Sequence, residues 1–394
     1  MSVPKLRFKE FEGNWAIQPL KNICKINQGL QIAIENRFKD EGENRHFYIT
    51  NEFLKEGAKK SYFIENPPRN VLCDEHDILM TRTGNTGQVV SNVRGAFHNN
   101  FFKIIFDKTE INKDFFIEFL RKETTQHLIL KYAGASTIPD LNHSDFYRIG
   151  MPVPLIEEQT KIALFLSAVD EKISQLTQKH ELLSQYKQGM MQKLFSQKIR
   201  FKADDGLFVE WKETTLGNIA EIVGGGTPST NHDEYWKGDV VWLTPSEINK
   251  KFIGESKRTI SELGVQKCSA KKLPKGTLLF TSRATIGEVS IATKEVTTNQ
   301  GFQSFIPYSS TNNEFLYYWI IQNKKQFIER ASGSTFLEIS KTKIQPIKIL
   351  LPCLEEQIKI ASFLSAIDQK IEIVAKQVEQ TKQWKKGLLQ QMFV

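Results

Sequence analysis

Side chains able to recognise base pairs recur in the turn-rich stretches of this sequence. Arginine recognises guanine, and asparagine or glutamine recognises adenine, through paired hydrogen bonds to the base edge in the major groove. Four such stretches read "TRTGNTG" from Thr81, "HNNFFK" from His98, "TSRATIG" from Thr281 and "TNQGFQSF" from Thr298. Ordinary polar surface loops contain the same residue types, so each stretch alone is a weak signal. Taken together they indicate a candidate surface for hydrogen bonding to a nucleic acid.

Motifs of the common enzyme classes are incomplete or absent. The Asn-Pro-Pro-Arg run from Asn66 has Arg69 where adenine methyltransferases need an aromatic ring to hold a flipped base. No glycine-rich cofactor loop precedes it, so a turn is the better interpretation. The glycine-rich run from Val223 lacks the Lys-Ser/Thr ending of a phosphate-binding loop. The sequence therefore predicts a chain without a catalytic site.

Metal and nucleophile motifs are missing as well. The seven histidines form no His-Glu-x-x-His pair, and no Gly-x-Ser-x-Gly elbow occurs. The four cysteines lie far apart without a Cys-x-x-Cys pair, which argues against a zinc site or a disulfide framework. The carboxylates of Glu157 and Glu158 are placed at a helix start, where they favour the helix dipole. We therefore expect no metal and no cofactor in this chain.

Composition limits the class of protein. The 394 residues carry a net charge of +8, with 40% hydrophobic and 25% charged residues, which is ordinary globular composition. The sequence pI of about 9.0 mildly favours a polyanionic partner. No apolar run reaches the roughly 18 residues that a membrane span requires, and the N-terminus lacks an apolar signal core. We expect a cytoplasmic protein.

An internal repeat is the dominant feature of the chain. The segment "EEQTKIALFLSAVDEKI" from Glu157 returns as "EEQIKIASFLSAIDQKI" from Glu355, an offset of 198 residues. The same offset aligns "QYKQGMMQKLF" with "QWKKGLLQQMF", and "ASTIPDL" with "GSTFLEI". The starts of the two halves correspond at an offset of 196, with Trp15 matching Trp211. Each half therefore combines a variable domain with a nearly constant segment, which predicts domains at 1–153 and 199–351 and segments at 154–198 and 352–394.

The constant segments are predicted to be helices that pair as a coiled coil. Apolar residues recur at alternating steps of three and four, which is a heptad seam, and each segment follows a proline. His180 and Lys187 interrupt the first seam, and Thr381 and Lys385 interrupt the second. The seam residues, which we also consider for partner docking, are Leu166, Val169, Ile173, Leu176, Leu183, Met190, Leu364, Ile367, Ile371, Val374, Val378 and Leu388.

Chain geometry favours an antiparallel pair. About 40 residues at 1.5 Å rise give a rod of roughly 60 Å, and the second variable domain begins only a few residues after the first rod ends. A second rod that starts directly after that domain can run back beside the first. We expect two globular domains at opposite ends of the helical pair, related by a pseudo-two-fold axis. The alternative is that each helix packs only in its own domain.

The variable domains are predicted to have mixed α+β structure. Short β-rich runs include "HFYIT", "DILMTR", "GQVVSNV" and "FFKIIF" in the first, and "DVVWLT", "GTLLFTSR", "GEVSIAT" and "FQSFIPY" in the second. Glycine and asparagine turns separate these runs. One helix-like stretch follows each set of strands, from Lys113 and from Asn313.

The combination of motifs resembles the specificity subunit of type I restriction-modification systems. The resembling parts are "GGTPST", "WKGDVVWLTPSEI", "TSRATIG", "ASGSTFLEIS" and "LEEQIKIASFLSAID" in the second half. The first half contributes "TRTGNTG", "AGASTIPDL" and "IEEQTKIALFLSAVD". The resemblance covers essentially the whole chain, although the first half lacks the Gly-Thr-Pro-Ser turn at its entry.

The resemblance implies a non-catalytic subunit with two target recognition domains, each reading one half of a bipartite, asymmetric DNA site. It implies helices that set the spacing and dock two modification subunits, which carry S-adenosylmethionine and methylate adenine, and restriction subunits that use ATP and Mg. The candidate DNA-binding residues are Arg82, Asn85, Thr86, Asn99, Asn100, Ser136, Thr137, Thr244, Ser246, Arg283, Thr285, Asn299, Gln300, Gln303 and Ser334. Two alternatives remain open: a solitary DNA methyltransferase with fused recognition domains, and a coiled-coil scaffold that binds no DNA.

Overall fold

Two compact units make up the chain. The structure is a computed structural model that describes residues 3–55, 57, 61–134, 138–283, 285–333 and 337–394. Unit 1 contains residues 1–177 and 375–394, and unit 2 contains residues 178–374. Two long helices, α5 (Ile156–Phe195) and α11 (Leu354–Met392), each contribute one part to unit 1 and the other part to unit 2.

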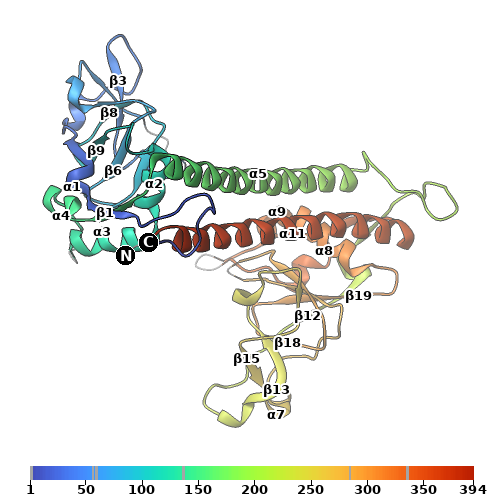
Figure 1. Ribbon diagram of the computed structural model, residues 1–394. Coiled ribbons are helices and arrows are strands. Elements are labelled where there is room, and N and C mark those ends of the chain that lie inside the picture. Colours follow the sequence, from blue (N-terminus) through green and yellow to red (C-terminus); the bar gives the residue numbers. More distant parts are fainter. Residues whose placement is uncertain (1–2, 56, 58–60, 135–137, 284, 334–336) are drawn as a thin grey trace. The chain divides into compact units, whose positions relative to one another are not determined.

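Unit 1 is a mixed α+β domain (Figure 1). Its strands form two four-stranded sheets, ordered β2-β9-β6-β7 and β4-β3-β8-β5, and a separate pair, β1-β10. The elements are β1 (Ala16–Pro19), α1 (Leu20–Ile23), β2 (Cys24–Gln28), η1 (Ile34–Asn36), β3 (Arg45–Ile49), β4 (Phe63–Glu65), η2 (Arg69–Val71), β5 (Leu72–Cys73), β6 (Ile78–Thr81), β7 (Val89–Ser91), β8 (Gly95–Phe97), β9 (Phe101–Phe106), α2 (Lys113–Arg121), α3 (Glu123–Ala133), α4 (His143–Tyr147) and β10 (Gly150–Val153).

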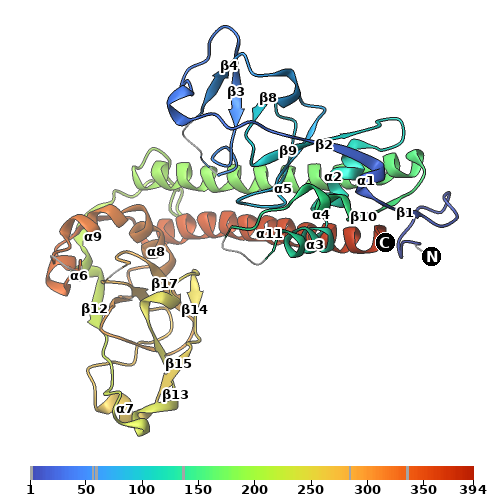
Figure 2. The same cartoon turned by 90° about the vertical axis from the view of Figure 1, so that its left-hand side faces the viewer.

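Unit 2 repeats this design. Its sheets are ordered β12-β19-β16-β17-β14 and β15-β13-β18, with the separate pair β11-β20. The strands β13 and β15 and the short helix α7 lie together at the end of the unit remote from α8 (Figure 2). The elements are β11 (Lys212–Thr215), α6 (Leu216–Ile219), β12 (Ala220–Gly224), η3 (Asp233–Tyr235), β13 (Trp236–Leu243), η4 (Pro245–Glu247), β14 (Phe252–Ile253), β15 (Arg258–Ile260), α7 (Glu262–Gln266), β16 (Leu278–Phe280), β17 (Val289–Ala292), β18 (Thr297–Thr298), β19 (Gln303–Pro307), α8 (Asn313–Gln322), α9 (Lys324–Arg330), α10 (Lys341–Ile344) and β20 (Lys348–Leu351).

One sheet of each unit shares a common order of four strands, β2-β9-β6-β7 in unit 1 and β12-β19-β16-β17 in unit 2, where β14 adds a fifth strand. In both, an antiparallel pair (β2 with β9, β12 with β19) continues into a hairpin (β6 with β7, β16 with β17). The central strands β6 and β16 are buried along their whole length, as expected for apolar runs inside a sheet. The eight β-rich runs predicted from the sequence all contain strands, so that part of the prediction is confirmed.

The long helices run antiparallel. In unit 1 the core contains Leu166 and Val169 from the start of α5 together with Leu388 and Met392 from the end of α11. In unit 2 the core contains Leu194 from the end of α5 and residues from the start of α11, including Leu364 and Ile367. Each unit is therefore completed by the end of the helix that belongs to the other half of the sequence.

The predicted seam residues lie inside these helical pairs. Leu166, Val169, Leu176, Leu364, Ile367, Val374 and Leu388 are buried, and Ile173, Leu183, Met190, Ile371 and Val378 are half-buried. The two long helices are consistent with a coiled coil, and the role of the individual seam residues remains a proposal. Because the seam is occupied by the pair itself, partner docking on these side chains would require other exposed faces of the helices.

The helix-like stretch after each set of strands is two helices, where the sequence pattern suggested one. Lys122 leaves the helical conformation, with φ −56° and ψ 135°, and separates α2 from α3. Its side chain is buried, and its ammonium group donates to the backbone oxygen of Val394 at 3.2 Å. At the equivalent position Asn323 separates α8 from α9 and donates its amide to the oxygen of Trp319. No helix among the described residues is long and apolar enough to span a bilayer.

Candidate nucleic-acid interface

The predicted base-contacting stretches of unit 1 meet in one loop cluster. The backbone N–H of Arg82 donates to the oxygen of Asn100 at 2.7 Å, which joins the turn after β6 to the turn before β9. The side-chain amide of Asn51, in the segment after β3, donates to the oxygen of Thr83 at 3.1 Å. The turn itself is closed by Gly87, whose N–H donates to the oxygen of Thr81. Stretches far apart in the sequence therefore form one surface.

Unit 2 holds its corresponding stretches in the same way. The backbone N–H of Ser282 donates to the oxygen of Gly301 at 2.8 Å, and that of Gly287 donates to the oxygen of Thr281 at 3.1 Å. The hydroxyl groups of Thr81 and Thr281 both donate to the backbone inside their turns. The two units thus share a scaffold for the same loop cluster.

A glycine brings the loop after the first sheet strand into this cluster in each unit. A Cβ atom on Gly29 would lie 2.2 Å from the oxygen of Phe97, and one on Gly225 would lie 2.0 Å from the oxygen of Asn299. Real Cβ atoms do not approach backbone that closely, so only glycine fits. The glycine-rich run from Val223 therefore serves close backbone packing.

The motif arginines are ion-paired within each cluster. Arg82 donates two hydrogen bonds to Asp140, at 2.8 and 3.0 Å, and the hydroxyl of Thr83 donates to the same carboxylate. The hydrogen bond from Arg82 lowers the pKa of Asp140 below the ordinary carboxylate value, more strongly than burial raises it. In unit 2 Arg283 pairs with Glu338 at 2.8 Å. Arg82 is the more enclosed, with 18% of its side chain exposed against 44% for Arg283.

The candidate DNA-binding residues differ in how accessible they are. Asn85, Ser246, Arg283, Thr285 and Gln300 are exposed, whereas Arg82, Asn99, Asn100, Thr244, Asn299 and Gln303 are half-buried. Ser136, Thr137 and Ser334 lie outside the described residues. The exposed members give the cluster side chains that could meet a ligand directly.

Two of the predicted residues have clear roles inside the fold. The buried hydroxyl of Thr86 donates to the backbone oxygens of Arg82 and Pro139, at 3.0 and 2.7 Å. Thr244 forms a capping box with Glu247 at the start of η4. These contacts use the side chains to shape the loops, and they were not visible in the sequence pattern.

A buried carboxylate ties each domain to its long helix. Glu158 accepts two hydrogen bonds from Arg7, both at 2.8 Å, and one from the indole N–H of Trp15. In unit 2 Arg200 and Trp211 make the same contacts to Glu356. The helix-start interpretation of these glutamates was incomplete, because Glu158 is almost fully buried while its neighbour Glu157 is exposed.

The adjacent glutamines have an equally structural role. The amide of Gln159 donates to the oxygens of Glu110 and Pro154 and accepts from the N–H of Asn112. Gln357 makes the equivalent bonds to Ser310, Pro352 and Asn312. The repeated Glu-Gln pair in the sequence was the available signal for this junction, since a polar pair that recurs unchanged indicates a specific contact.

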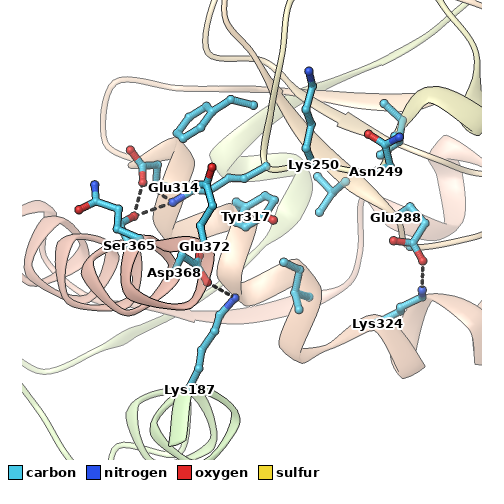
Figure 3. Close-up of a pocket in the computed structure, with 17 residues that line it drawn as sticks. Lys187, Asn249, Lys250, Glu288, Glu314, Tyr317, Lys324, Ser365, Asp368 and Glu372 are labelled. Atoms are coloured by element: carbon cyan, nitrogen blue, oxygen red, sulfur yellow. Dashed lines mark hydrogen bonds and ion pairs between the residues drawn. The ribbon is translucent and has the colours of Figure 1, made fainter. Parts of the chain in front are cut away.

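Two of the four polar interruptions of the heptad seams, Lys187 and Lys385, form ion pairs. Lys187 of α5 pairs with Asp368 of α11 at 2.6 Å in unit 2, and Figure 3 shows its ammonium group directed at that carboxylate. Lys385 pairs with Asp170 at 2.7 Å in unit 1. Both members of the two pairs are related by the 198-residue offset. An isolated polar residue in a coiled-coil seam can set the register of the pair, and these two pairs suit that role.

A cavity of about 670 Å³ lies between the sheet domain and the long helices of unit 2 (Figure 3). On its wall Lys251 donates to Glu314, Tyr318 and Ser365 at 2.6 to 2.8 Å. Burial would raise the pKa of Glu314, but the hydrogen bonds from Lys251 and Ser365 lower it overall. The polar groups of this wall thus satisfy one another and fix the domain to α11. Among the described residues, no group of three or more potential metal ligands occurs.

The helices also expose apolar side chains on their outer faces. Trp384 in unit 1 and Tyr186 in unit 2 occupy equivalent repeat positions and are 53% and 51% exposed. Further exposed apolar residues of the helices are Leu164, Leu182, Ile358 and Ile373. Large exposed aromatic residues are common anchors of protein interfaces. These residues were missed by the sequence analysis, which considered only the seam.

Comparison with known proteins agrees with this duplicated design. The model of the type I restriction modification DNA specificity domain matches residues 12–185 and again residues 209–383. The MjaIX specificity subunit of a type I restriction enzyme from Methanocaldococcus jannaschii is 41% identical over 175 residues. That match covers 43% of this chain and 40% of the relative, less than half of its length. The MjaVIII specificity subunit of the same organism is 26% identical over an alignment that covers 97% of this chain and 94% of the relative.

A solved structure shares the fold of the whole chain. The crystal structure of the S subunit of a type I restriction-modification system from M. genitalium has a TM-score of 0.61 and 19% sequence identity, covering 100% of this chain and 99% of that chain. A structure described as showing complex assembly and conformational transition of the type I R-M system has a TM-score of 0.59 over 95% of this chain. With two matched copies of the specificity domain spanning most of its length, this chain belongs to the family of type I restriction-modification DNA specificity subunits.

Proposed function

We propose that this chain is the DNA-reading subunit of a type I restriction-modification complex. Residues 1–153 and 199–351 each read one half of a bipartite, asymmetric site, and residues 154–198 and 352–394 set the distance between the halves. The observation that carries the proposal is the pair of loop clusters on one shared scaffold with different exposed residues. Two different half-sites can be read by two domains that share one backbone scaffold and differ in the side chains exposed on it.

The DNA contacts are proposed to come from the loop clusters. Exposed Asn85, Arg283 and Gln300 are placed to reach base edges or phosphates, in keeping with the positive charge of the chain. Ser136, Thr137 and Ser334 remain proposals from the sequence alone.

The helices are proposed to bind two copies of a modification subunit. Trp384 and Tyr186 are equivalent in the repeat and similarly exposed, so one type of partner surface could recognise both. The modification subunits would hold S-adenosylmethionine and methylate adenine, and restriction subunits would use ATP and Mg in the cytoplasm. The present chain would supply recognition and spacing.

A footprint of the assembled complex on DNA tests this function. The chain is co-expressed with its modification subunit, and the complex is bound to a DNA fragment that contains its site. We expect two protected patches separated by a spacer that lacks base-specific contacts. A single patch, or no sequence preference at all, would contradict the proposal.

A further inference from the structure

One polar pair of side chains crosses between two loops at the same place in each unit. In unit 1 the amide of Asn99 donates to Oε1 of Gln31 at 3.0 Å. In unit 2 the hydroxyl of Thr227 donates to Oε1 of Gln300. We call Gln31–Asn99 and Thr227–Gln300 the cross-loop pairs. Each joins the loop after the first sheet strand (β2 or β12) to the turn before the strand that pairs with it (β9 or β19).

The backbone beneath the cross-loop pairs is the same in both units. The N–H of Leu30 donates to the oxygen of Phe97 at 3.1 Å, and that of Gly226 donates to the oxygen of Thr298 at 2.9 Å. Gln31 and Thr227 are the next residues on one side. Asn99 and Gln300 both lie two residues beyond the accepting residue on the other side. The two pairs are therefore structural equivalents built from different residues.

Polar residues that only stabilise the fold differ from the cross-loop pairs, because they are of the same type in both halves of the chain. The buried polar contacts to the long helices use the same residue types in both halves: Arg7 and Arg200, Trp15 and Trp211, Glu158 and Glu356, Gln159 and Gln357. The cross-loop pairs keep their backbone positions while their side chains change. A position that is fixed in space and varied in chemistry suits recognition of two different sequences.

In unit 1 the pair leaves Gln31 ready to contact a base. Gln31 is exposed, and its Oε1 is oriented by the amide of Asn99. Among the residues that the structure describes, no group accepts a hydrogen bond from its own amide N–H groups. Asn99 is itself held, because the side chain of Gln28 donates to its backbone oxygen at 3.3 Å. The Oδ1 atom of Asn99 is buried and has no hydrogen-bond partner among the described residues. Asn99 therefore orients Gln31.

In unit 2 the roles of the two loops are exchanged. Gln300 lies on the turn before β19 and is exposed, and its Oε1 is oriented by the hydroxyl of Thr227. Within the described part of the chain, its amide N–H groups likewise have no hydrogen-bond acceptor. In both units an exposed glutamine thus presents a fixed amide, with free donors beside an oxygen that retains a second lone pair.

We propose that Gln31 and Gln300 each read an adenine in the major groove, one in each half-site. Adenine offers N7 as an acceptor and the N6 amino group as a donor, which matches a glutamine amide with two hydrogen bonds. Orientation of the amide before binding reduces the entropy lost when those bonds form. The inference rests on the proposed function, and it adds the residues, the base and the mode of contact.

The test selects bound sequences from a randomised DNA library with the assembled complex of this chain and its modification subunit. For the unaltered complex we expect an A·T pair at one fixed position of each half-site. Gln31→Ala should reduce discrimination at the first half-site position by roughly 5- to 140-fold and leave the second half-site unchanged. Gln300→Ala should give the reciprocal result.

A second substitution, Gln31→Glu, should change which base is preferred at that position. Gln31→Glu keeps an oxygen that can accept from Asn99 but removes the donor to adenine N7. Because a carboxylate accepts from the N4 amino group of cytosine, the preferred base at that position should change from adenine toward cytosine. The matched control is Gln175→Ala, which removes another exposed amide of unit 1, hydrogen-bonded within α5 to Glu171. It should leave the selected sequence unaltered.

The outcomes separate the inference from the function on which it rests. If the unaltered complex selects a bipartite site and Gln31→Ala and Gln31→Glu leave every position unchanged, the inference is overturned and the function stands. Uniform weakening on all sequences would also overturn it, because the pair would then support the loop or a phosphate contact. If the unaltered complex selects no bipartite site, the proposed function fails, and the inference fails with it.

Discussion

One group of buried polar side chains is the same in both halves of the chain. Glu158 and Glu356 are buried and each is satisfied by an arginine and a tryptophan from the start of its own domain. A buried carboxylate without such partners would be strongly unfavourable, so any change on one side requires a change on the other. At the residue scale, these repeated residues are therefore the ones whose substitution would strongly destabilise the fold.

The two adjacent glutamates of the second repeat should differ sharply in their effect on stability. Glu356→Ala leaves Arg200 without its carboxylate in a largely enclosed site, and removing one partner of such a pair costs about 3–5 kcal/mol. Glu355→Ala changes an exposed residue, and its effect should stay within about 0.5 kcal/mol. Chemical denaturation of the two variants checks this. Equal losses would show that Glu356 has no special role.

The motif arginines should both matter for DNA binding, in distinguishable ways. If Arg283 reads a guanine, Arg283→Ala should cost about 1–3 kcal/mol on the cognate site and relax one position. If it holds a phosphate, binding should weaken on all sequences and the salt slope should fall by about one. Arg82→Ala should in addition loosen the segment around Asp140, which hydrogen exchange would detect. Unchanged binding in both variants would show that the arginines only shape the turns.

The ion pair of Arg82 should be insensitive to mild acid. A carboxylate whose pKa is lowered in the folded state stabilises the fold at higher pH, and this contribution is lost only as the pH falls through the lowered value. The lowered pKa of Asp140 lies below the ordinary 3.8 of an aspartate. The loss of DNA binding and the faster hydrogen exchange caused by Arg82→Ala should therefore have the same size at every pH between about 5 and 8.

At the scale of elements, the sequence predicted what depends on local pattern. The heptad seams identified α5 and α11, and the β-rich runs identified the strands β3, β6, β7, β9, β13, β16, β17 and β19, because apolar patterning decides both. It did not predict the breaks at Lys122 and Asn323, or the strand pairs β1-β10 and β11-β20, because these depend on contacts far away in the chain. The loops proposed to bind DNA were chosen by residue type, and their ion pairs with Asp140 and Glu338 were not predicted.

The end of α11 and the residue that follows it, Phe393, belong to the core of unit 1. Phe393 is 2% exposed, stacks on Phe115 at 4.9 Å between ring centroids, and meets the edge of Trp15. Phe195, at the equivalent repeat position, packs on Phe315 in unit 2. The end of each helix therefore stabilises the domain encoded in the other half of the sequence.

Phe393→Ala should consequently destabilise unit 1. Truncation of a buried phenylalanine costs about 3–5 kcal/mol. Hydrogen exchange should accelerate in β6 and β9, at residues 78–106, while β16 and β19 keep their protection. Val394→Ala, which changes a residue 43% exposed, is the control and should have little effect. Faster exchange confined to residues 278–307 would contradict the assignment of this helix end to unit 1.

At the scale of the whole molecule, the repeat suggests that the end of α5 can replace the end of α11 in completing unit 1. Unit 1 is completed by Lys385, Leu388 and Met392 of α11 and by Phe393, which follows α11. At the 198-residue offset α5 carries Lys187, Met190, Leu194 and Phe195. A fragment of residues 1–198 therefore contains both a recognition domain and close substitutes for the helix end that this domain needs. We expect two such fragments to pair antiparallel about a true two-fold axis.

The pairing of fragments should be weaker than the pairing within the intact chain, because the effective concentration supplied by the covalent link is lost. The polar side chain of His180 would also lie against a second copy of the same seam, which further weakens the pairing. Binding of the modification subunits is expected to hold the dimer together. Its two recognition domains would be identical, so its site should be a palindrome built from the first half-site.

Mapping of methylated adenine in cells tests the central claim most directly. One strain expresses the full chain with its modification subunit, and a second expresses residues 1–198 with the same subunit. We predict an asymmetric bipartite site in the first strain and, in the second, the first half-site repeated in inverted orientation with a similar spacer. A fragment site that is asymmetric, or unrelated to either half of the parent site, would contradict the claim that each half of the chain reads its own half-site.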